Sequence, residues 1–299
     1  MVKSKIKKVS TDIIAFNIVG YIIITIIMLL CLIPFLLIVS GSFTSDEAIS
    51  KFGFSLIPKE FSLAAYKMLF SFPEQILRAY GVSILVTVSG TVTGLILMSM
   101  AGYVLMRRDF EARNKIAFFL YFTTLFSGGL IPWYMLISKY LNMQDMYSAL
   151  IIPELVGVFN ILLFRNFMKS IPDSLIESAK IDGAGDFLIY WKMMLPLSKP
   201  VIATVGLFVA LSYWNNWFMA SLFIKNANKY PLQYLLYKTL QSAQFLNASQ
   251  ASQYVVSTNV PTESLKMATA VVATGPIILL YPFVQKFFVK GITIGAVKG

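Results

Sequence analysis

Residues 177–196 read ESAKIDGAGDFLIYWKMMLP and form a charged, glycine-bearing interruption in a very apolar chain. Pro172 and Asp173, just upstream, are typical of a helix start, because proline fixes the turn and the aspartate can accept from free backbone N–H groups. Gly183 can adopt the left-handed conformation that ends a helix and turns the chain. The stretch therefore predicts a helix that stops at a glycine elbow.

A second short helix is expected after the elbow. Asp186 can cap its start, and the helix then runs to Leu195-Pro196. The two helices would lie at the membrane surface with one small apolar face, a shape that suits docking into a groove on another protein. The alternative is an amphipathic interfacial loop that only joins two membrane helices.

The composition is that of an all-α integral membrane protein. The chain of 299 residues is 57% hydrophobic and 13% charged, far below the roughly 25% charged residues of soluble domains. Runs near the roughly 20 residues needed to cross a bilayer recur along the chain. They predict six transmembrane helices, at residues 18–39, 80–106, 116–137, 147–164, 201–224 and 265–289.

Lysine and arginine set the expected orientation. With the N-terminus inside, most of the 25 basic residues fall in inner segments. The inner positions are Lys3, Lys5, Lys7, Lys8, Arg107, Arg108, Arg113, Lys115, Arg165, Lys169, Lys180, Lys192, Lys199, Lys286, Lys290 and Lys298. Both termini and the loop 165–200 are therefore predicted to be cytoplasmic, and the net charge of +11 needs no nucleic acid to explain it.

The residue inventory excludes several chemistries. Histidine is absent and Cys31 is the single cysteine, so the sequence predicts no metal site, no disulfide and no catalytic residues of the Ser-His or Cys-His type. Gly128-Gly129 is not followed by the Gly-Lys-Ser/Thr of a phosphate-binding loop. If ATP drives transport here, ATP and Mg²⁺ bind to another subunit, and this chain carries no cofactor.

One acid lies in an apolar run. Glu154 follows Pro153 near the outer start of the fourth predicted span. A proton- or sodium-coupled carrier places acids at mid-membrane, whereas a lone acid at this position can simply be hydrated from outside. No internal repeat of the kind found in many carriers is visible. These features favour an energy source outside the chain.

The substrate pathway is sought among polar and aromatic residues within the spans. Tyr213-Trp214-Asn215-Asn216-Trp217 lies midway along the fifth span. Sugars need amide partners for their hydroxyl groups and flat rings for their C–H faces, and this cluster offers both. The same residues can instead hold helices together. Asn160 in the fourth span is a weaker pathway candidate that could act only in helix packing.

The loop around Glu177 resembles the EAA loop of binding-protein-dependent ABC importer permeases. The resemblance rests on Glu177-Ser178-Ala179, then Gly183 after three intervening residues, and Leu195-Pro196 after a further gap. The family usually has Glu-Ala-Ala and Ile-x-Leu-Pro, so Ser178 and Met193 are conservative departures. By this resemblance Glu177, Ser178, Ala179, Asp182, Gly183, Leu195 and Pro196 belong to the loop that couples the permease to its ATPase.

Further stretches narrow the resemblance. FSGGLIP at residues 126–132, Ser198-Lys199-Pro200, the Trp214-Asn215 pair and VKGITIGAVKG at residues 289–299 are similar to one subgroup of carbohydrate ABC permeases. That subgroup handles complex oligosaccharides in Gram-positive bacteria. The resemblance implies the type I importer fold, with an N-terminal segment at residues 1–17, a permease domain at residues 18–299, and a C-terminal tail that reaches the ATPase in some relatives.

The resemblance also implies the partners and the mechanism. They are a second, related permease, an ATPase dimer, an extracellular substrate-binding lipoprotein, membrane lipid and the carbohydrate, with no nucleic acid. The expected function is carbohydrate import through the cell membrane by alternating access, and the chain itself is not an enzyme. A secondary carrier or channel for a small polar solute is the alternative, and an integral-membrane enzyme comes third because no catalytic cluster is visible.

Overall fold

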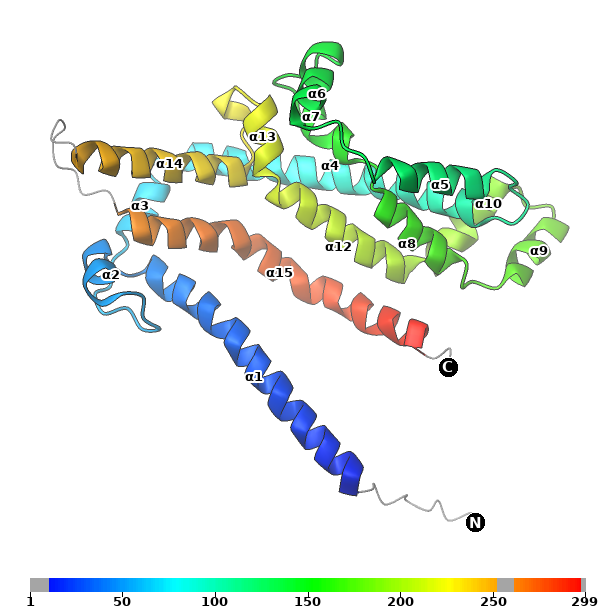
Figure 1. Cartoon of the computed structure of the whole chain (residues 1–299), viewed down its shortest axis with the longest axis horizontal. Helices are drawn as coiled ribbons and strands as arrows, with labels where there is room; N and C mark the ends of the chain where they lie inside the picture. Colours follow the sequence, from blue (N-terminus) through cyan, green and yellow to red (C-terminus); the bar gives the residue numbers. More distant parts are fainter. Residues whose placement is uncertain (1–10, 252–260, 297–299) are drawn as a thin grey trace. The chain divides into compact units, whose positions relative to one another are not determined.

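The computed structural model describes residues 11–251 and 261–296, with side chains for residues 16–245, 261–279 and 282. These ranges are helical, and their one β feature is an isolated antiparallel bridge between Thr44 and Phe61 (Figure 1). The chain divides into two compact units, residues 1–71 with 240–272 and residues 72–239 with 273–299. The predicted all-α class is therefore confirmed for the described residues.

The first unit contains a long apolar helix and two short ones. They are α1 (Thr11–Ser42), α2 (Asp46–Phe52) and α3 (Ala64–Leu69), joined by the first turns of α15 (Thr262–Ala296). The Asp46 side chain accepts hydrogen bonds from the backbone N–H groups of Glu263 at 3.0 Å and Ser264 at 2.9 Å. It therefore satisfies donors that the start of a helix leaves free, and it fixes α2 to α15.

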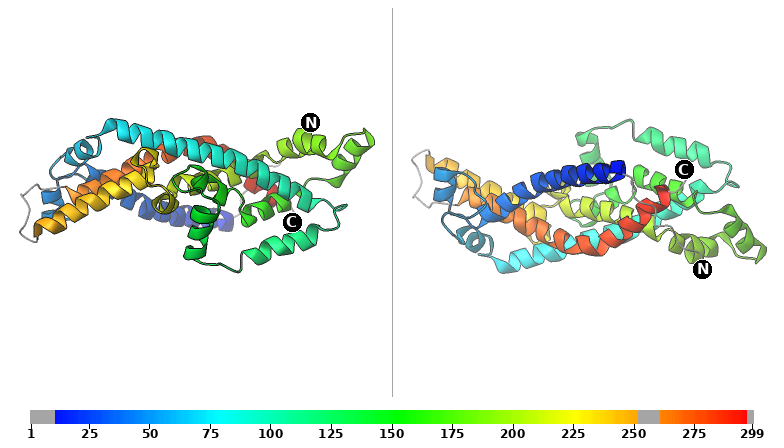
Figure 2. Two further views of the ribbon diagram at one scale, coloured as in Figure 1. Left: turned by 90° about the horizontal axis from the view of Figure 1, so that it is seen from above. Right: turned by 90° about the horizontal axis from the view of Figure 1, so that it is seen from below.

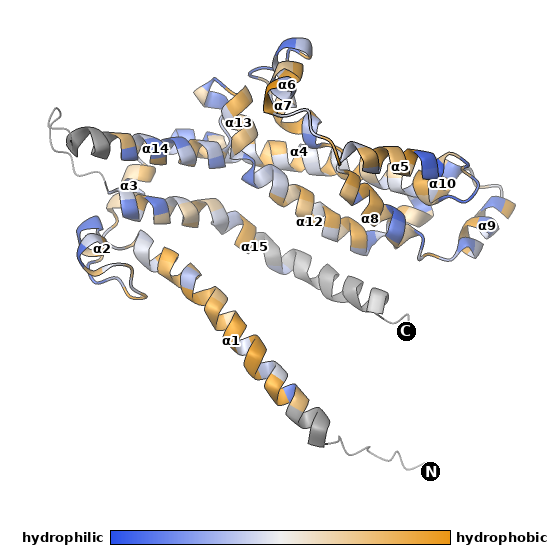
Figure 3. Ribbon diagram, in the orientation of Figure 1, coloured by the Kyte–Doolittle hydropathy of each residue, from blue (hydrophilic) through white to orange (hydrophobic). Residues whose placement is uncertain are grey.

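Helix α1 is apolar on every side (Figure 3). Within Phe16–Ser42, the most apolar window of 18 residues has a mean hydropathy of 3.3 and contains no residue buried within the chain. A helix that is hydrophobic all round must be covered by lipid or by another protein. The predicted first span, residues 18–39, lies within it.

The second unit is built around α4 (Pro73–Met106), along which α8 and α12 pack (Figure 1 and Figure 2). Its other elements follow in chain order, and two of them, η1 and η3, are π-helical turns. They are α5 (Arg113–Thr123), α6 (Leu130–Met135), η1 (Leu136–Tyr140), α7 (Ser148–Ile151), η2 (Ile152–Glu154), α8 (Val158–Met168), α9 (Asp173–Ile181), α10 (Asp186–Ile189), η3 (Tyr190–Met194), α11 (Leu195–Leu197), α12 (Lys199–Asn215), α13 (Trp217–Phe223) and η4 (Ala227–Lys229). Helix α14 (Leu232–Ala251) begins in this unit, and α15 ends in it.

Glycines let α4 approach its neighbours closely. A Cβ atom on Gly102 would come within 2.5 Å of the Phe164 Cβ of α8, and one on Gly94 within 3.0 Å of the Leu155 carbonyl oxygen. Gly90 likewise has no room for a Cβ atom, because the Tyr213 ring of α12 lies against it. The small-residue face of this helix therefore packs inside the chain itself.

Four of the described segments are candidates for crossing a membrane. Phe16–Ser42 (27 residues) and Pro73–Met106 (34 residues) are long and apolar enough alone. Ser148–Glu154 with Val158–Met168, bent by 47°, and Asp186–Leu197 with Lys199–Asn215, bent by 80°, qualify if each pair is one span. The described residues thus give two to four candidates, and six spans with both termini inside stay a prediction.

Three predicted spans are not single helices. Residues 147–164 are divided among α7, η2 and α8, with a bend of 47° before α8. Residues 116–137 are divided between α5 and α6, because Gly129, with a φ of +86°, has a non-helical backbone directly before α6. Residues 201–224 are divided between α12 and α13, because Asn216, with φ −82° and ψ 66°, leaves the helix and caps the next one. Sequence periodicity does not register such breaks, since the flanking residues stay apolar.

Candidate functional site

The elbow predicted between residues 173 and 196 is present. Asp173 does not cap α9 as predicted, because Pro172 occupies the capping position and the Asp173 carboxylate pairs with Arg108. Helix α9 ends at Ile181, Gly183 has a φ of +81°, and the chain turns there. The N–H of Ala184 donates to the Ala179 carbonyl at 2.9 Å and the N–H of Gly183 donates to the Lys180 carbonyl at 3.0 Å. This pair of bonds is the Schellman pattern, which needs a left-handed residue at the position of Gly183.

The second helix forms as α10, η3 and α11 and ends at Leu197, so Leu195 and Pro196 lie in its last turn. The prediction that Asp186 caps this helix is wrong. Gly185 occupies the capping position without a side-chain bond, and Asp186 is the first helical residue. Its carboxylate accepts a hydrogen bond from Arg107 instead, because a strong cation lies within its reach.

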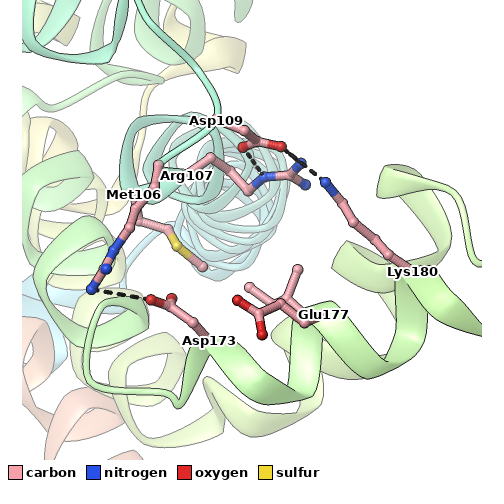
Figure 4. Close-up of a pocket in the computed structure, with 8 residues that line it drawn as sticks. Met106, Arg107, Asp109, Asp173, Glu177 and Lys180 are labelled. Atoms are coloured by element: carbon pink, nitrogen blue, oxygen red, sulfur yellow. Dashed lines mark hydrogen bonds and ion pairs between the residues drawn. The ribbon is translucent and has the colours of Figure 1, made fainter.

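A charged pocket of about 210 Å³ lies between α9 and the segment that follows α4 (Figure 4). Two ion pairs close it on either side, Arg108 with Asp173 at 3.1 Å and Lys180 with Asp109 at 2.9 Å. Glu177 lines the pocket between them. The pocket is lined by Met106, Arg107, Arg108, Asp109, Asp173, Ile176, Glu177 and Lys180.

Arg107 is the electrostatic centre of this region. Its Nε donates to Asp109 Oδ1 at 2.7 Å and its Nη1 donates to the Tyr103 hydroxyl at 2.9 Å. The Arg107 guanidinium, with help from Lys180, holds the pKa of the Asp109 carboxyl well below its usual range. The pair therefore stays charged at any physiological pH, and Arg107 is only 8% exposed.

Large apolar side chains are exposed around the elbow. Ile181 at the end of α9 is 86% exposed and Phe187 at the start of α10 is 69% exposed. The Phe187 and Trp191 rings stack with centroids 6.3 Å apart. Ser178, Asp182 and Gly183 are exposed beside them, and Ala179 is half-buried. The elbow thus presents an apolar knob with a polar border, which is typical of a protein-binding surface.

Part of the aromatic cluster on the fifth span is internal. Tyr213 and Trp214 are buried. The Tyr213 hydroxyl donates to the Ile151 carbonyl at 2.8 Å, and the Trp214 Nε1 donates to the Ala273 carbonyl at 3.0 Å. Both side chains join segments that are distant in sequence, which is the packing role considered above.

The other three residues of the cluster meet additional polar groups. The Asn216 Oδ1 accepts from the N–H of Met219 at 3.1 Å and caps α13, while its Nδ2 donates to Glu154. Asn215 is exposed and accepts from Gln233 at 3.2 Å. Trp217 stacks on Tyr237 with ring centroids 4.3 Å apart. This polar and aromatic surface is called the pathway cluster below: Glu154, Asn215, Asn216, Trp217, Gln233 and Tyr237.

Sequence reasoning missed two of these relationships. Glu154 joins the pathway cluster rather than standing alone as a hydrated acid, and Arg107 is a buried centre rather than only an inner positive charge. Neighbouring residues predict neither the Glu154–Asn216 contact nor the Arg107–Asp186 contact, because the partners are distant in sequence. Asn160 lies half-buried in α8, and no hydrogen bond of the described residues joins it to the cluster. The described residues also contain no group of three metal-binding side chains.

Comparison with known proteins assigns the family. Residues 15–294 match the family of the binding-protein-dependent transport system inner membrane component. The chain belongs to this family. It is therefore a multi-pass permease of the cell membrane and not an enzyme, as the EAA-like loop and the composition predicted. Such importers work with a separate ATPase and a substrate-binding protein.

Two curated relatives come from Bacillus subtilis (strain 168). The polygalacturonan/rhamnogalacturonan transport system permease protein YtcP is 42% identical over 271 residues, which cover 91% of this permease and 94% of YtcP. Protein LplC is 43% identical over 269 residues, which cover 90% of each chain. These alignments include the elbow and the pathway cluster in nearly full-length matches.

A solved structure supports the fold. One chain in the crystal structure of a bacterial ABC transporter involved in the import of the acidic polysaccharide alginate is 32% identical to this permease. It matches with a TM-score of 0.77 over 94% of this permease and 99% of that chain. The expected fold of an ABC importer permease is therefore confirmed at the level of the chain.

Proposed function

We propose that this permease passes an oligosaccharide from an extracellular binding lipoprotein into the cytoplasm by alternating access. ATP and Mg²⁺ bind to an ATPase dimer, and a second, related permease completes the membrane part. In this arrangement the domain at residues 18–299 crosses the membrane six times with both termini in the cytoplasm, and residues 1–17 lie inside or at the interface. Alternating access needs two states that ATP binding and release can interconvert.

The elbow carries the proposal. Gly183 stops α9 with a backbone geometry that other residues adopt at a cost, and the exposed Ile181 and Phe187 lie on either side of it in the sequence. A partner groove that accepts this knob would bury its apolar surface and meet Glu177 at the pocket. We assign the groove to the ATPase, with Glu177, Ser178, Ala179, Asp182, Gly183, Leu195 and Pro196 in the docking segment.

The pathway cluster supports a sugar as the cargo. The amide groups of the exposed Asn215 and the half-buried Gln233 can bond hydroxyl groups, and the Trp217–Tyr237 pair offers a flat apolar face. Tyr213, Trp214 and Asn160 would shape the pathway from behind. YtcP is named for polygalacturonan/rhamnogalacturonan transport, and the solved transporter is involved in the import of alginate. These names favour an oligosaccharide over a small solute such as a secondary carrier moves.

The test is affinity purification of the tagged permease from its native membrane in mild detergent, followed by mass spectrometry. We expect a second permease, an ATPase and a sugar-binding lipoprotein. Glu177→Lys should keep the second permease but lose most of the ATPase, whereas Glu111→Lys, the same charge change on an exposed residue outside the loop, should keep both. Recovery of a folded permease without any ATPase would support the carrier or channel alternative.

A further inference from the structure

The inner end of α4 carries three polar side chains on one face. Ser99, Tyr103 and Arg107 follow one another at intervals of four residues, so they line up along the helix. The facing segment carries Asp186 and Tyr190, which are also four residues apart and lie in α10 and η3. Two helical segments therefore face each other with matching polar spacing.

These five side chains form two hydrogen-bonded groups that are joined by a contact between two tyrosine rings, and they are called the α4 joint below. The hydroxyl groups of Ser99 and Tyr190 are 2.8 Å apart, and the Tyr103 and Tyr190 rings lie 5.5 Å apart. Arg107 donates to the Tyr103 hydroxyl at 2.9 Å and to the Asp186 carboxylate. Each hydrogen-bonding group in the α4 joint thus has its partner within the α4 joint.

Most of these side chains are buried, so breaking their hydrogen bonds costs free energy. Ser99 is 1% exposed, Tyr190 2% and Arg107 8%. A buried polar group that loses its partner keeps the cost of its lost hydration. Separation of α10 from α4 would break the buried Ser99–Tyr190 hydrogen bond and the Arg107–Asp186 ion pair, and it would part the Tyr103 and Tyr190 rings. The two segments are therefore expected to move together.

Further hydrogen bonds attach α9 and the start of α5 to Arg107 and its partner Asp109. Asp109 accepts from Arg107 and also from Lys180 of α9 at 2.9 Å. The Arg113 guanidinium donates to the Arg107 carbonyl at 3.0 Å, which fixes the backbone after α4. Both helices of the elbow are therefore attached to the end of α4 through Arg107 and its partners.

Helix α4 continues to the pathway cluster. Its 34 residues correspond to about 50 Å of helix, and Gly90 on the same helix contacts Tyr213 next to Asn215 and Asn216. A displacement of Arg107 should therefore also move the part of α4 that contacts Tyr213, because one continuous helix joins the two positions and a helix resists compression more than a loop does.

We propose that Arg107, Asp186 and Tyr190 are positioning residues that make the elbow and α4 move as one body when the ATPase changes state. The inference rests on the proposed function, since it needs the elbow to dock on the ATPase. It assigns to a cytoplasmic arginine a role in transport that lies outside the docking segment itself.

The experiment measures a distance within the assembled complex by pulsed electron paramagnetic resonance. Spin labels are placed on Lys192→Cys, an exposed position in η3, and on Gly81→Cys, where nothing lies within 4 Å of an added Cβ, in a Cys31→Ser background. The complex is recorded without nucleotide and with ATP and vanadate, so no sugar needs to be known. We expect one narrow distance that is the same in both states.

Arg107→Gln and Asp186→Asn are expected to shift or broaden this distance in the vanadate state while the ATPase stays bound. Arg108→Gln is the matched control, because Arg108 neighbours Arg107 but has a side chain 82% exposed and pairs only with Asp173; its distance should not change. Tyr190→Phe removes one hydroxyl and serves if the arginine variant does not fold.

The proposal is overturned if Arg107→Gln or Tyr190→Phe keeps the wild-type distance in both states, or if Arg108→Gln changes it equally. It is also overturned if the wild-type distance itself changes with ATP and vanadate. Absence of the ATPase from the wild-type complex would refute the proposed function, whereas a bound ATPase with an unchanged distance in the variants would refute only the α4 joint.

Discussion

The ring of Tyr213 lies against the backbone of Gly90, and a Cβ atom on Gly90 would come within 2.4 Å of the ring. The contact joins two helices. Helix α12 carries Asn215 of the pathway cluster, and α4 carries Ser99 and Tyr103 of the α4 joint. The Tyr213 hydroxyl is fixed at the same time by the Ile151 carbonyl at 2.8 Å. The ring therefore cannot move away from α4 without loss of a buried hydrogen bond.

Gly90→Ala is expected to displace Tyr213 and to lower the free energy of unfolding by about 1–3 kcal/mol, as overpacking does in well-packed cores. Thermal unfolding in detergent, followed by tryptophan fluorescence, measures the change. Gly81→Ala on the same helix has no atom within 4 Å of its new Cβ and should be neutral or slightly stabilising. Equal melting temperatures for the two variants would contradict this account.

Gly183→Ala is expected to weaken ATPase binding, because a residue with a side chain pays about 1–2 kcal/mol to adopt the left-handed φ of +81°. Retention of the ATPase on the tagged permease reports the effect. Gly185→Ala provides the control, since Gly185 has a φ of −71° and free space around it. Gly183→Leu should be more severe than Gly183→Ala, with membrane insertion unchanged; full transport by Gly183→Leu would refute the role of the elbow.

Asn216→Ala is expected to remove the cap of α13 and to cost about 1 kcal/mol of stability. Asn216→Ser keeps an oxygen for the N–H of Met219 but loses the donor to Glu154. Comparison of the two by thermal unfolding and by uptake separates the cap from the pathway. We expect Ser to restore stability but not uptake; if Ser restores both, the contact with Glu154 has no part in transport.

Asp145 holds the segment 225–229 that follows α13, and it should do so down to low pH. Its carboxylate accepts from the N–H of Asn226 at 3.0 Å and of Lys225 at 3.1 Å, and these bonds, with Lys229, lower its pKa. A lowered folded-state pKa gives stability that is complete above the unfolded value of about 3.9 and is lost as the pH falls below it.

Asp145→Ala should therefore lower the melting temperature by the same amount at pH 7.5 and pH 5.5, with a smaller difference only below about pH 4. Asp145→Asn is the control, because asparagine tolerates the positive φ of 60° at this position but carries no charge. A difference between wild type and Asp145→Ala that already disappears between pH 7.5 and pH 5.5 would show that the carboxylate is not held in its charged form.

Local sequence was enough for the elbow. Glycine at position 183 and proline at position 172 act within a few residues of themselves, so the start and end of α9 could be predicted with no knowledge of the fold. The choice of Gly183 over Gly185 as the left-handed residue also agrees with the helix spacing. Asp186 was misassigned because its partner, Arg107, lies 79 residues away in the chain.

The spans were predicted less completely. Apolar runs indicated where α4 and α1 lie, since a long continuous helix follows from composition alone. The breaks at Gly129 and Asn216 were not expected, because a hydropathy window averages over a single residue that leaves the helix. Residue types indicated a polar and aromatic cluster at residues 213–217 but not its division into buried and exposed parts. Its role as the substrate pathway stays a prediction.

The sequence by itself determined the class of protein, the family and the glycine elbow, because composition, motif spacing and backbone preference act over short distances. Tertiary structure alone decided which charges pair and which polar groups are buried. Arg107 reaches Asp186, Glu154 reaches Asn216, and Tyr213 closes on Gly90. The physical reason is that side-chain pairing depends on which helices become neighbours, and no residue in one segment specifies that neighbour.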